Sequence, residues 1–444
     1  MGETSSSETI STKQARIAKL ARQMPDKQLN TLSHYMDLEW LTEAYRRTRK
    51  DGAVGVDGQT AAQYAQQLQE NLQSLLDRAK SGDGYRAPPV RRAFVPKGDG
   101  KQRPIGIPTF EDKILQRAVV MLLEPLYETM FHESSYGFRP GRNAHHALEQ
   151  LRQGLTGLQG GWVLELDIRS YFDTVEHEKL RALLRKRVGD GVVLRLIGKW
   201  LKAGVLQEGC IYHPENGTPQ GGVVSPLLAN LYLHEVLDTW FADAVRPRLR
   251  GRAFMVRYAD DAVLVFERQD DAERVQAVIG NRFAKYGLEL HPEKTRLLEF
   301  KSPGRKNGGG GDGGGSFEFL GFTHYWAVSR QGNWVVLRKT STKRMSRSLR
   351  AFGQWMSRHR HEPIGKQHAA LSVKLRGYFG YFGISGNSRT LVSFRHWVMV
   401  RWHYWLNRRS NQRLTWETYL RMLQRFALPR PRVTRTVLPR TANP

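Results

Sequence analysis

Two adjacent aspartates, Asp260 and Asp261, have the surroundings that point most clearly to chemistry in this chain. Apolar, β-rich runs at 254–257 and 262–266 flank them, and this pattern predicts a β-hairpin with carboxylates at its tip. Carboxylates between buried strands need a counter-charge. A pair of Mg²⁺ ions can supply it, because hard cations bind carboxylate oxygens and substrate phosphates. Paired acids at a hairpin are also common on surfaces, so further residues must decide.

A third acid, Asp167, ends another β-like run at 162–168, 93 residues before Asp260. Acids at the ends of neighbouring strands suit a two-metal site, which activates one oxygen and stabilises the leaving oxygen of an in-line phosphoryl displacement. We therefore expect Asp167 and Asp260 to be ligands of both metals, with Asp261 completing the site. The alternative for Asp261 is a charge that only shapes the hairpin.

The elements that must position these acids follow from apolar periodicity. Residues 13–50, 60–80 and 111–130 have apolar residues at helical spacing. Residues 85–108 are typical of a β-hairpin with 97–101 at its turn. Residues 162–300 alternate strand-like and helix-like segments, which predicts a small antiparallel sheet backed by helices. The run 302–316 is rich in glycine and predicts a flexible connection.

The composition favours a nucleic-acid partner. The chain has 444 residues, enough for two or three domains, and a formal charge of +27. Such an excess predicts a polyanionic partner whose affinity falls steeply with salt. Cys210 is the single cysteine, which fits a reducing compartment. We expect the protein in the bacterial cytoplasm, associated with nucleoprotein. Neither a signal peptide nor a membrane-spanning apolar stretch is present, so we expect no membrane partner.

The basic excess is concentrated in residues 341–444, which hold 21 Lys or Arg against two acids, Glu362 and Glu417. Tryptophan, tyrosine and phenylalanine are interleaved with these cations. A basic surface with aromatics suits RNA, through phosphate contacts and base stacking. Part of the aromatic set must instead form helix core.

The ordered motifs along the chain resemble those of reverse transcriptases encoded by group II introns, the intron maturases. The matching blocks lie at 55–58, 94–97 with 103–108, 135–142, around 167, 217–230, around 258, 287–288 with 291–295, and 319–322. Each block is moderately specific, whereas the ordered set is highly specific.

This resemblance implies an α+β fold of the right-hand polymerase type, in which fingers and palm contain an antiparallel sheet and an α-helical thumb follows. The implied domains are an N-terminal extension with the start of the fingers (1–84), a fingers and palm core (85–300), a Gly-rich linker with the end of the palm (301–340), a helical thumb or maturase domain X (341–430) and a basic tail (431–444).

The resemblance also implies ligands for the metals and the triphosphate. The backbone carbonyl of Ile168 would add a ligand to two Mg²⁺ ions, for which Mn²⁺ can substitute. Lys97, Arg103 and Arg91 lie on the expected fingers hairpin and would hold the triphosphate, because Arg binds phosphate bidentately and Lys as a point charge. Contact with the template backbone is the alternative for all three.

The resemblance implies roles for four further residues. Phe172 would abut the sugar 2′ carbon and exclude ribonucleotides, although the residues alone favour an ordinary core position. Gln220 would line the nucleotide pocket, and Tyr258 would lie under the primer terminus. Lys294 would contact phosphate or the metal-site carboxylates, with a solvated lysine as the alternative.

In the expected thumb we assign RNA binding to Arg376, Arg401, Arg408 and Arg409.

The sequence thus predicts an RNA-directed DNA polymerase encoded by a group II intron, which also binds intron RNA as a maturase in splicing and retrohoming. Its expected partners are intron RNA, an RNA template with a DNA primer, target DNA and dNTPs. No Cys pairs or His-Asn-His pattern follows the thumb region, which favours a compact form without an endonuclease domain. The alternatives are a reverse transcriptase recruited to a defence or CRISPR system, and a pure RNA-binding splicing cofactor.

Overall fold

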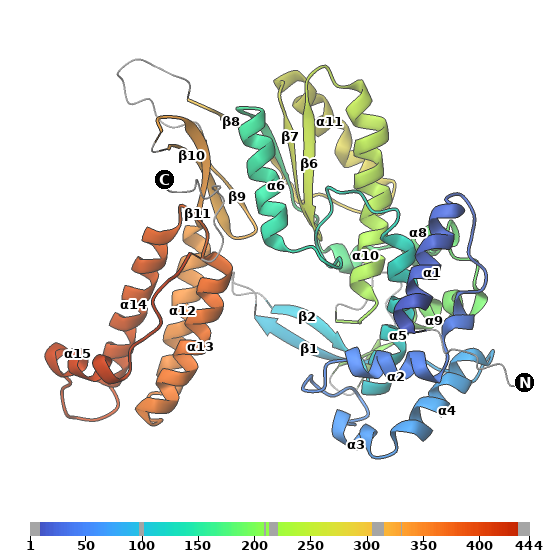
Figure 1. Ribbon diagram of the computed structural model, residues 1–444, viewed down its shortest axis with the longest axis horizontal. Helices are drawn as coiled ribbons and strands as arrows, with labels where there is room; N and C mark the ends of the chain where they lie inside the picture. Colours follow the sequence, from blue (N-terminus) through green and yellow to red (C-terminus); the bar gives the residue numbers. More distant parts are fainter. Residues whose placement is uncertain are drawn as a thin grey trace, which may run out of the picture. The chain divides into compact units, whose positions relative to one another are not determined.

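The computed structural model describes residues 9–96, 102–207, 210–212, 221–303, 315–329 and 331–433. The chain forms two compact units (Figure 1). Unit 1 comprises residues 1–147 and 164–297, and unit 2 comprises 148–163 and 298–444. The predictions for Lys97, Gln220, most of the Gly-rich run and most of the basic tail fall outside the described residues.

The N-terminal helices of unit 1 pack around one long apolar helix, α5 (Phe110–Tyr127). They are α1 (Ile10–Gln23), η1 (Leu32–Tyr35), α2 (Leu38–Arg47), α3 (Ala61–Ala65) and α4 (Leu68–Lys80). The fully buried Trp40 donates from Nε1 to the carbonyl of Ala118 at 3.0 Å, which fixes α2 on α5. The expectation of helix throughout 13–50 is wrong at 24–31, 36–37 and 48–50. Pro25 cannot continue a helix, and Asp37 caps the next one.

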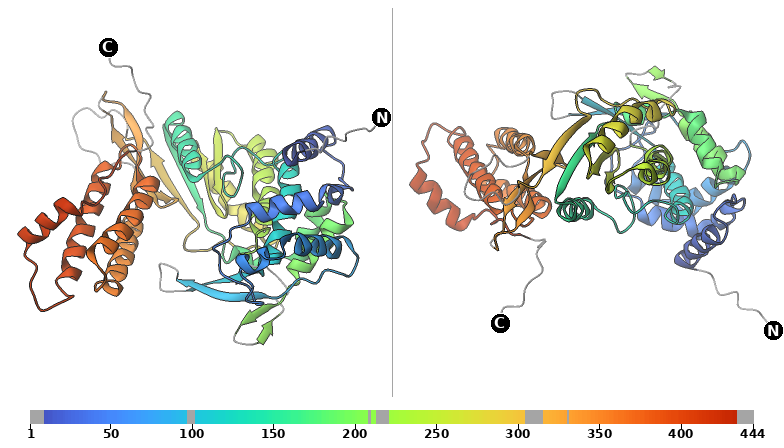
Figure 2. Two further views of the ribbon diagram at one scale, coloured as in Figure 1. Left: turned by 60° about the horizontal axis from the view of Figure 1, so that its bottom comes forward. Right: turned by 90° about the horizontal axis from the view of Figure 1, so that it is seen from above.

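A four-stranded mixed sheet with order β2-β1-β4-β5 follows. Strands β1 (Val90–Pro96) and β2 (Gln102–Ile107) are antiparallel, which confirms the two arms of the predicted hairpin, and β1 is parallel to β4 (Val205–Gln207). Strand β4 pairs with β5 (Cys210–Tyr212). Figure 2 shows the short β4–β5 hairpin projecting from the rest of unit 1.

The second four-stranded sheet carries the aspartates and has order β6-β7-β3-β8. Its strands are β3 (Gly160–Leu166), β6 (Ala253–Tyr258), β7 (Asp261–Phe266) and β8 (Arg296–Lys301). The helical segments of this part of the chain are α7 (Tyr171–Thr174), α8 (His177–Arg185), α9 (Gly191–Leu201), α10 (Ser225–Leu233), the π-helical η2 (His234–Val245), η3 (Arg246–Arg248) and α11 (Gln269–Ala284). The continuous helix formed by α10 and η2 runs alongside the β6–β7 hairpin (Figure 1).

Unit 2 combines a small sheet with helices. Strands β9 (Phe317–Phe319), β10 (Phe322–Val328) and β11 (Trp334–Thr340) form an antiparallel sheet of order β11-β10-β9. Helices α12 (Thr342–Arg358), α13 (Ile364–Phe382), α14 (Ser388–Leu406) and α15 (Trp416–Arg425) follow it, and α6 (Ala144–Gly157) precedes β3. Together with the sheets of unit 1, these helices confirm the predicted α+β class with a helical C-terminal region.

The aromatic residues of unit 2 divide as expected into core and surface. Trp402 is fully buried, and Tyr378 stacks on Phe394 with ring centroids 3.7 Å apart. Trp397 and Tyr404 are instead 46% and 48% exposed. Among the helices that the structure describes, none is long and apolar enough to cross a membrane.

Candidate active site

The β6–β7 hairpin places two acids at a tight turn. Tyr258 pairs with Asp261 across the strands, so that Ala259 and Asp260 form a two-residue connection. Ala259 has a φ of 57°, a left-handed conformation that two-residue hairpin turns require and that alanine rarely adopts. The sequence prediction of carboxylates at a hairpin tip therefore matches the observed turn.

The turn is packed closely against the 135–142 segment. A Cβ added to Gly137 would lie 2.3 Å from the Ala259 nitrogen, so this approach requires glycine. The next residue, Phe138, has a φ of 56° and is 55% exposed. Ser170, between Asp167 and α7, has a φ of 46°. Left-handed non-glycine residues cost on the order of 1–3 kcal/mol each and concentrate at functional sites.

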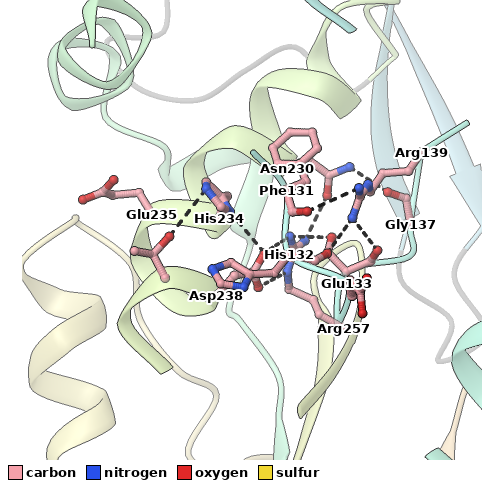
Figure 3. A network of polar contacts seen from close by, with 12 residues as sticks. Phe131, His132, Glu133, Gly137, Arg139, Asn230, His234, Glu235, Asp238 and Arg257 are labelled. Atoms are coloured by element: carbon pink, nitrogen blue, oxygen red, sulfur yellow. Dashed lines mark hydrogen bonds and ion pairs between the residues drawn. The ribbon is translucent and has the colours of Figure 1, made fainter. Parts of the chain in front are cut away.

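A buried arginine, Arg257, contacts the turn and belongs to a polar network with Asp238 and Asn230 (Figure 3). Arg257 has no exposed surface and donates to both carboxylate oxygens of Asp238, at 2.7 and 2.5 Å. It also donates to Asn230 Oδ1 at 2.9 Å, to Ser135 Oγ at 2.7 Å and to the carbonyl of Ala259 at 3.0 Å. One guanidinium thus links the β6–β7 turn to α10 and η2.

The same network organises the 135–142 segment, whose role the motifs alone did not reveal. Asn230 donates from Nδ2 to the Gly137 carbonyl at 2.6 Å. Arg139, 6% exposed, forms a forked ion pair with Glu128 and donates to the carbonyl of His132 at 2.6 Å. These contacts position the segment under the turn. The sequence signal was the presence of Arg, Asn and Ser in separate motif blocks, but their pairing could not be derived from spacing.

Asp167 is held by the chain that precedes β8. Its carbonyl accepts from the His291 nitrogen at 2.7 Å, and its own nitrogen donates to Thr295 Oγ1 at 3.4 Å. Ile168 pairs with Leu290, and the hydrogen bonds that flank this pair do not use the Ile168 carbonyl. Lys294 Nζ lies 3.3 Å from Asp167 Oδ2. The structure therefore brings Lys294 to one of the expected metal-site carboxylates.

The three carboxylates interact with one another. Burial, together with the charge on Asp167, raises the pKa of Asp260, while the guanidinium of Arg103 opposes the rise. Asp261 has accessible surface but is enclosed by protein on most sides. Desolvation and the charges on Asp260 and Asp167 raise the pKa of Asp261 to about 7, against the opposing effect of Arg103 and Lys294. Repulsion of this kind marks a site that a bound cation would stabilise.

The three acids have side-chain atoms of the kind that bind a hard divalent cation. All three acids offer carboxylate oxygens, the ligands that Mg²⁺ prefers. Within the described part of the chain no three His, Cys, Asp or Glu side chains already converge as a metal-binding group. A metal would therefore need substrate oxygens or a side-chain rotation to complete its coordination.

The residues expected to bind the nucleotide occupy different settings. Arg103 is exposed on β2, opposite Val95, and is close enough to influence Asp260 and Asp261. Arg91 instead donates from Nε and Nη2 to the Val54 carbonyl, at 3.0 and 2.8 Å, which fixes its guanidinium on the backbone. Phe172 lies on α7 and is only partly buried, so it is not an ordinary core residue.

Gln116 is a further candidate site residue, which the sequence pattern did not indicate. Its Oε1 accepts from the backbone nitrogens of Val223 and Val224, at 2.7 and 3.3 Å, just after the segment that contains Gln220. Its Nε2 donates to Asp112 Oδ2 at 2.9 Å. Burial raises the pKa of Asp112 to about 6. An aspartate and a glutamine at i and i+4, Asp112 and Gln116, within the apolar segment 111–130 were the available signal.

The four arginines assigned to the thumb lie in unit 2. Arg376 is exposed on α13. Arg401 donates from Nη1 to the Leu349 carbonyl at 3.0 Å and lines a groove of about 640 Å³ with the exposed Trp397 and Tyr404. Arg408 and Arg409 follow the end of α14, and the guanidinium of Arg408 lies 4.6 Å from the centroid of the Tyr404 ring.

Comparison with known proteins identifies the family. Residues 95–324 match the family described as reverse transcriptase (RNA-dependent DNA polymerase). Protein YkfC of Escherichia coli K12 is 38% identical over 323 residues, which cover 65% of this chain and 84% of that protein. The group II intron-encoded protein LtrA of Lactococcus lactis is 36% identical over 226 residues, which cover 50% of this chain and 37% of LtrA. The nuclear intron maturase 1 of Arabidopsis thaliana is 36% identical over 95 residues, 21% of this chain and 13% of the maturase.

The chain therefore belongs to the reverse transcriptase family, and its relatives place it with the group II intron-encoded members. This confirms the family, the enzyme class of RNA-directed DNA polymerase and the expectation of a nucleic-acid partner. Reverse transcriptases use divalent metal ions, in agreement with the donor chemistry of the three aspartates. The matched region covers little more than a third of LtrA, so the roles of individual residues and of the RNA partner remain proposals.

Proposed function

We propose that this chain extends a DNA primer on an RNA template, with Asp167, Asp260 and Asp261 holding two Mg²⁺ ions. The observation that carries the proposal is the clustering of three acids. Asp260 and Asp261 lie at the tip of the β6–β7 hairpin, and burial together with the charge of Asp167, which follows β3, raises the pKa of both. Lys294 lies 3.3 Å from Asp167, and Arg103 is close enough to oppose the rise in both pKa values. When bound, the two ions would lower the pKa of the primer 3′-hydroxyl and neutralise charge on the triphosphate. Mn²⁺ would fill the same oxygen sites.

The other site residues orient the substrates. Arg103, together with Lys97, would hold the triphosphate, and the partly buried ring of Phe172 would exclude a 2′-hydroxyl. Gln220 would line the nucleotide pocket, and Tyr258, beside the turn, would support the primer terminus. Arg91 fits this group less well, because its guanidinium is already anchored on the Val54 carbonyl. Its proposed contribution is to fix the base of the β1–β2 hairpin against the 54–57 segment.

The direct test is primer extension by the purified chain. A DNA primer on an RNA template should be extended with dNTPs and Mg²⁺, and Mn²⁺ should restore activity after chelation. Ca²⁺, which favours larger and more flexible coordination, should support binding without extension. Failure to extend under any divalent ion would remove the polymerase assignment and favour the pure RNA-binding alternative.

We infer a second role, in which the chain binds a folded intron RNA as a maturase in splicing and retrohoming. The basic surface of unit 2 and its exposed aromatics support it, since together they provide phosphate contacts and stacking platforms. Relatives named as intron-encoded proteins and maturases point the same way. Target DNA would be the further partner in retrohoming.

The two roles can be separated. The double variant Asp260→Ala with Asp261→Ala should lose extension and keep RNA affinity within a few-fold of wild type. The triple variant Arg401→Ala, Arg408→Ala and Arg409→Ala should weaken intron binding and reduce its salt slope by roughly one unit per lost phosphate contact. A splicing assay on a transcript with flanking exons completes the comparison. If the wild type improves splicing of no linked intron, a polymerase recruited to another system takes the place of the maturase.

A further inference from the structure

A basic groove lies between α8, α9 and the chain entering β1, among residues to which no role has yet been given. It has a volume of about 660 Å³ and belongs entirely to unit 1. Its described lining contains no Asp or Glu. Its cations are Arg86, Arg181, Arg185, Arg195, Lys199 and Lys202.

The helices place these cations on one concave face. Arg181 and Arg185 are one turn apart on α8, and Arg195, Lys199 and Lys202 follow one side of α9 and its end. From Arg195 to the C-cap Lys202 these positions extend over about 10 Å at the rise of an α-helix. This row is longer than a single phosphate group and suits a succession of phosphates.

Three of the six groove cations are held in place by contacts within unit 1. Lys199 donates to the Tyr85 carbonyl at 2.6 Å, and Arg195 donates to the Ser81 carbonyl at 3.2 Å. These neutral acceptors hold the side chains without cancelling their charge. Arg181 crosses α9 at Gly198, where an added Cβ would lie 2.9 Å from its Nη2, and it contacts the exposed Glu178 at 3.3 Å.

The other three cations are available to bind a partner. Arg86, Arg185 and Lys202 are exposed, and none has a side-chain hydrogen bond or ion pair within the described residues. Next to them, Ile211 on the β4–β5 hairpin is 53% exposed and lines the groove. Exposed cations beside an open apolar edge suit a nucleic-acid backbone better than a small apolar ligand, whose pocket would contain few charges.

We propose that this groove binds the phosphate backbone of double-helical RNA, at a site separate from the β6–β7 hairpin tip. A-form RNA presents a wide, shallow minor groove bordered by phosphates and 2′-hydroxyls, which a basic concave surface with an apolar edge can contact without reading sequence. The inference extends the proposed RNA-binding role and gives it a location in unit 1. The contact would hold structured RNA while extension proceeds elsewhere in the chain.

The test compares two triple variants of equal charge change. Arg86→Ala, Arg185→Ala and Lys202→Ala remove the three unpaired groove cations. Arg246→Ala, Arg248→Ala and Lys285→Ala remove three exposed cations elsewhere in unit 1. Affinity for a labelled RNA duplex of about 16 base pairs, the span of a typical double-stranded RNA module, is measured across a salt series with excess unlabelled primer–template present. The groove variant should bind at least tenfold more weakly, with a salt slope reduced by roughly three, and the control variant should bind like wild type.

A footprint locates the contact directly. The RNA duplex should protect Lys202, but not Lys285, from an amine-reactive reagent. Both variants should extend a short annealed primer–template at the wild-type rate, which separates failure of this inference from failure of the polymerase proposal. Equal RNA affinity of the two variants, or an unprotected Lys202, would overturn the groove assignment. Displacement of the duplex by inorganic triphosphate or polyglutamate at equal charge concentration would overturn it in favour of a small anion or an acidic protein.

Discussion

Arg257 Nη2 lies 2.5 Å from Asp238 Oδ2, and neither side chain has exposed surface. The pair joins β6 to the π-helical segment η2, next to the turn that carries Asp260. A buried pair of this kind contributes little net stability compared with apolar packing, but removing one partner leaves an uncompensated charge. Its value in this site is therefore positional, because the same guanidinium also fixes the Ala259 carbonyl.

We predict that Arg257→Met destabilises the chain by about 3–5 kcal/mol, because Asp238 would remain buried without a partner. The free energy of unfolding is measured by urea titration. Arg252→Met, which removes an exposed pair with Glu267 beside the same strand, is the control and should change stability little. The double variant Arg257→Met with Asp238→Leu should recover most of the stability but not the extension rate. A stable and fully active Arg257→Met would contradict the positional role.

Gln116→Met should raise the KM for dNTPs about tenfold, with a smaller effect on kcat. The variant removes the acceptor of two backbone N–H groups that follow Gln220, and a lost buried hydrogen bond costs roughly 1–3 kcal/mol. Steady-state kinetics with a single dNTP measure KM and kcat separately. Gln116→Glu keeps the acceptor and should retain more nucleotide affinity than Met. A uniform fall in kcat with unchanged KM would show that Gln116 supports only the fold.

The buried Asp112 predicts a pH dependence of stability. Because burial raises its folded pKa to about 6, above its unfolded value, the native state binds more protons than the unfolded state between these two values. Its contribution is fully present below the unfolded pKa and is lost as pH rises through about 6. Between about pH 5 and 7.5 the stability of wild type relative to Asp112→Asn should fall by roughly 1.4 kcal/mol. A difference that stays flat or rises with pH would contradict this assignment.

Phe172→Ala should increase incorporation of ribonucleotides relative to deoxynucleotides by at least tenfold, or about 1.4 kcal/mol of lost discrimination. The physical reason is the space opened where a 2′-hydroxyl would lie. Single-nucleotide incorporation assays give the ratio. Phe172→Tyr keeps the ring and should retain discrimination. If the alanine variant had the wild-type ratio of ribonucleotide to deoxynucleotide incorporation, Phe172 would contribute only to packing.

The sequence revealed those features that depend on local pattern. Alternating apolar runs predicted the strands on either side of Asp260 and Asp261. Helical periodicity predicted a helix at 111–130, and α5 occupies Phe110–Tyr127. The break between α1 and α2 was missed because apolar spacing resumes after Pro25 as though uninterrupted. Ordered motif blocks identified the family, because their combination is far more specific than any one of them.

The features that escaped prediction depend on contacts between distant segments. Nothing local distinguishes Arg257 from a solvated arginine on a strand, and its partners lie at Ser135, Asn230 and Asp238. Gln116 likewise acts on a segment 107 residues further along the chain. The anchoring of Arg91 on Val54 was hidden for the same reason. Long-range pairing of polar groups is set by the assembled fold rather than by residue spacing.

The account rests most directly on the carboxylates of Asp167 and Asp260. The decisive measurement is the single-turnover rate of dNTP addition to a DNA primer on an RNA template, for Asp260→Asn and Asp167→Asn. Asp243→Asn, at an exposed acid of unit 1, is the control. We predict no detectable extension by either site variant, a wild-type rate for the control, and undiminished folding of all three, since removing a repelling charge does not destabilise the metal-free site. Near-normal extension by Asp260→Asn or Asp167→Asn would contradict the account.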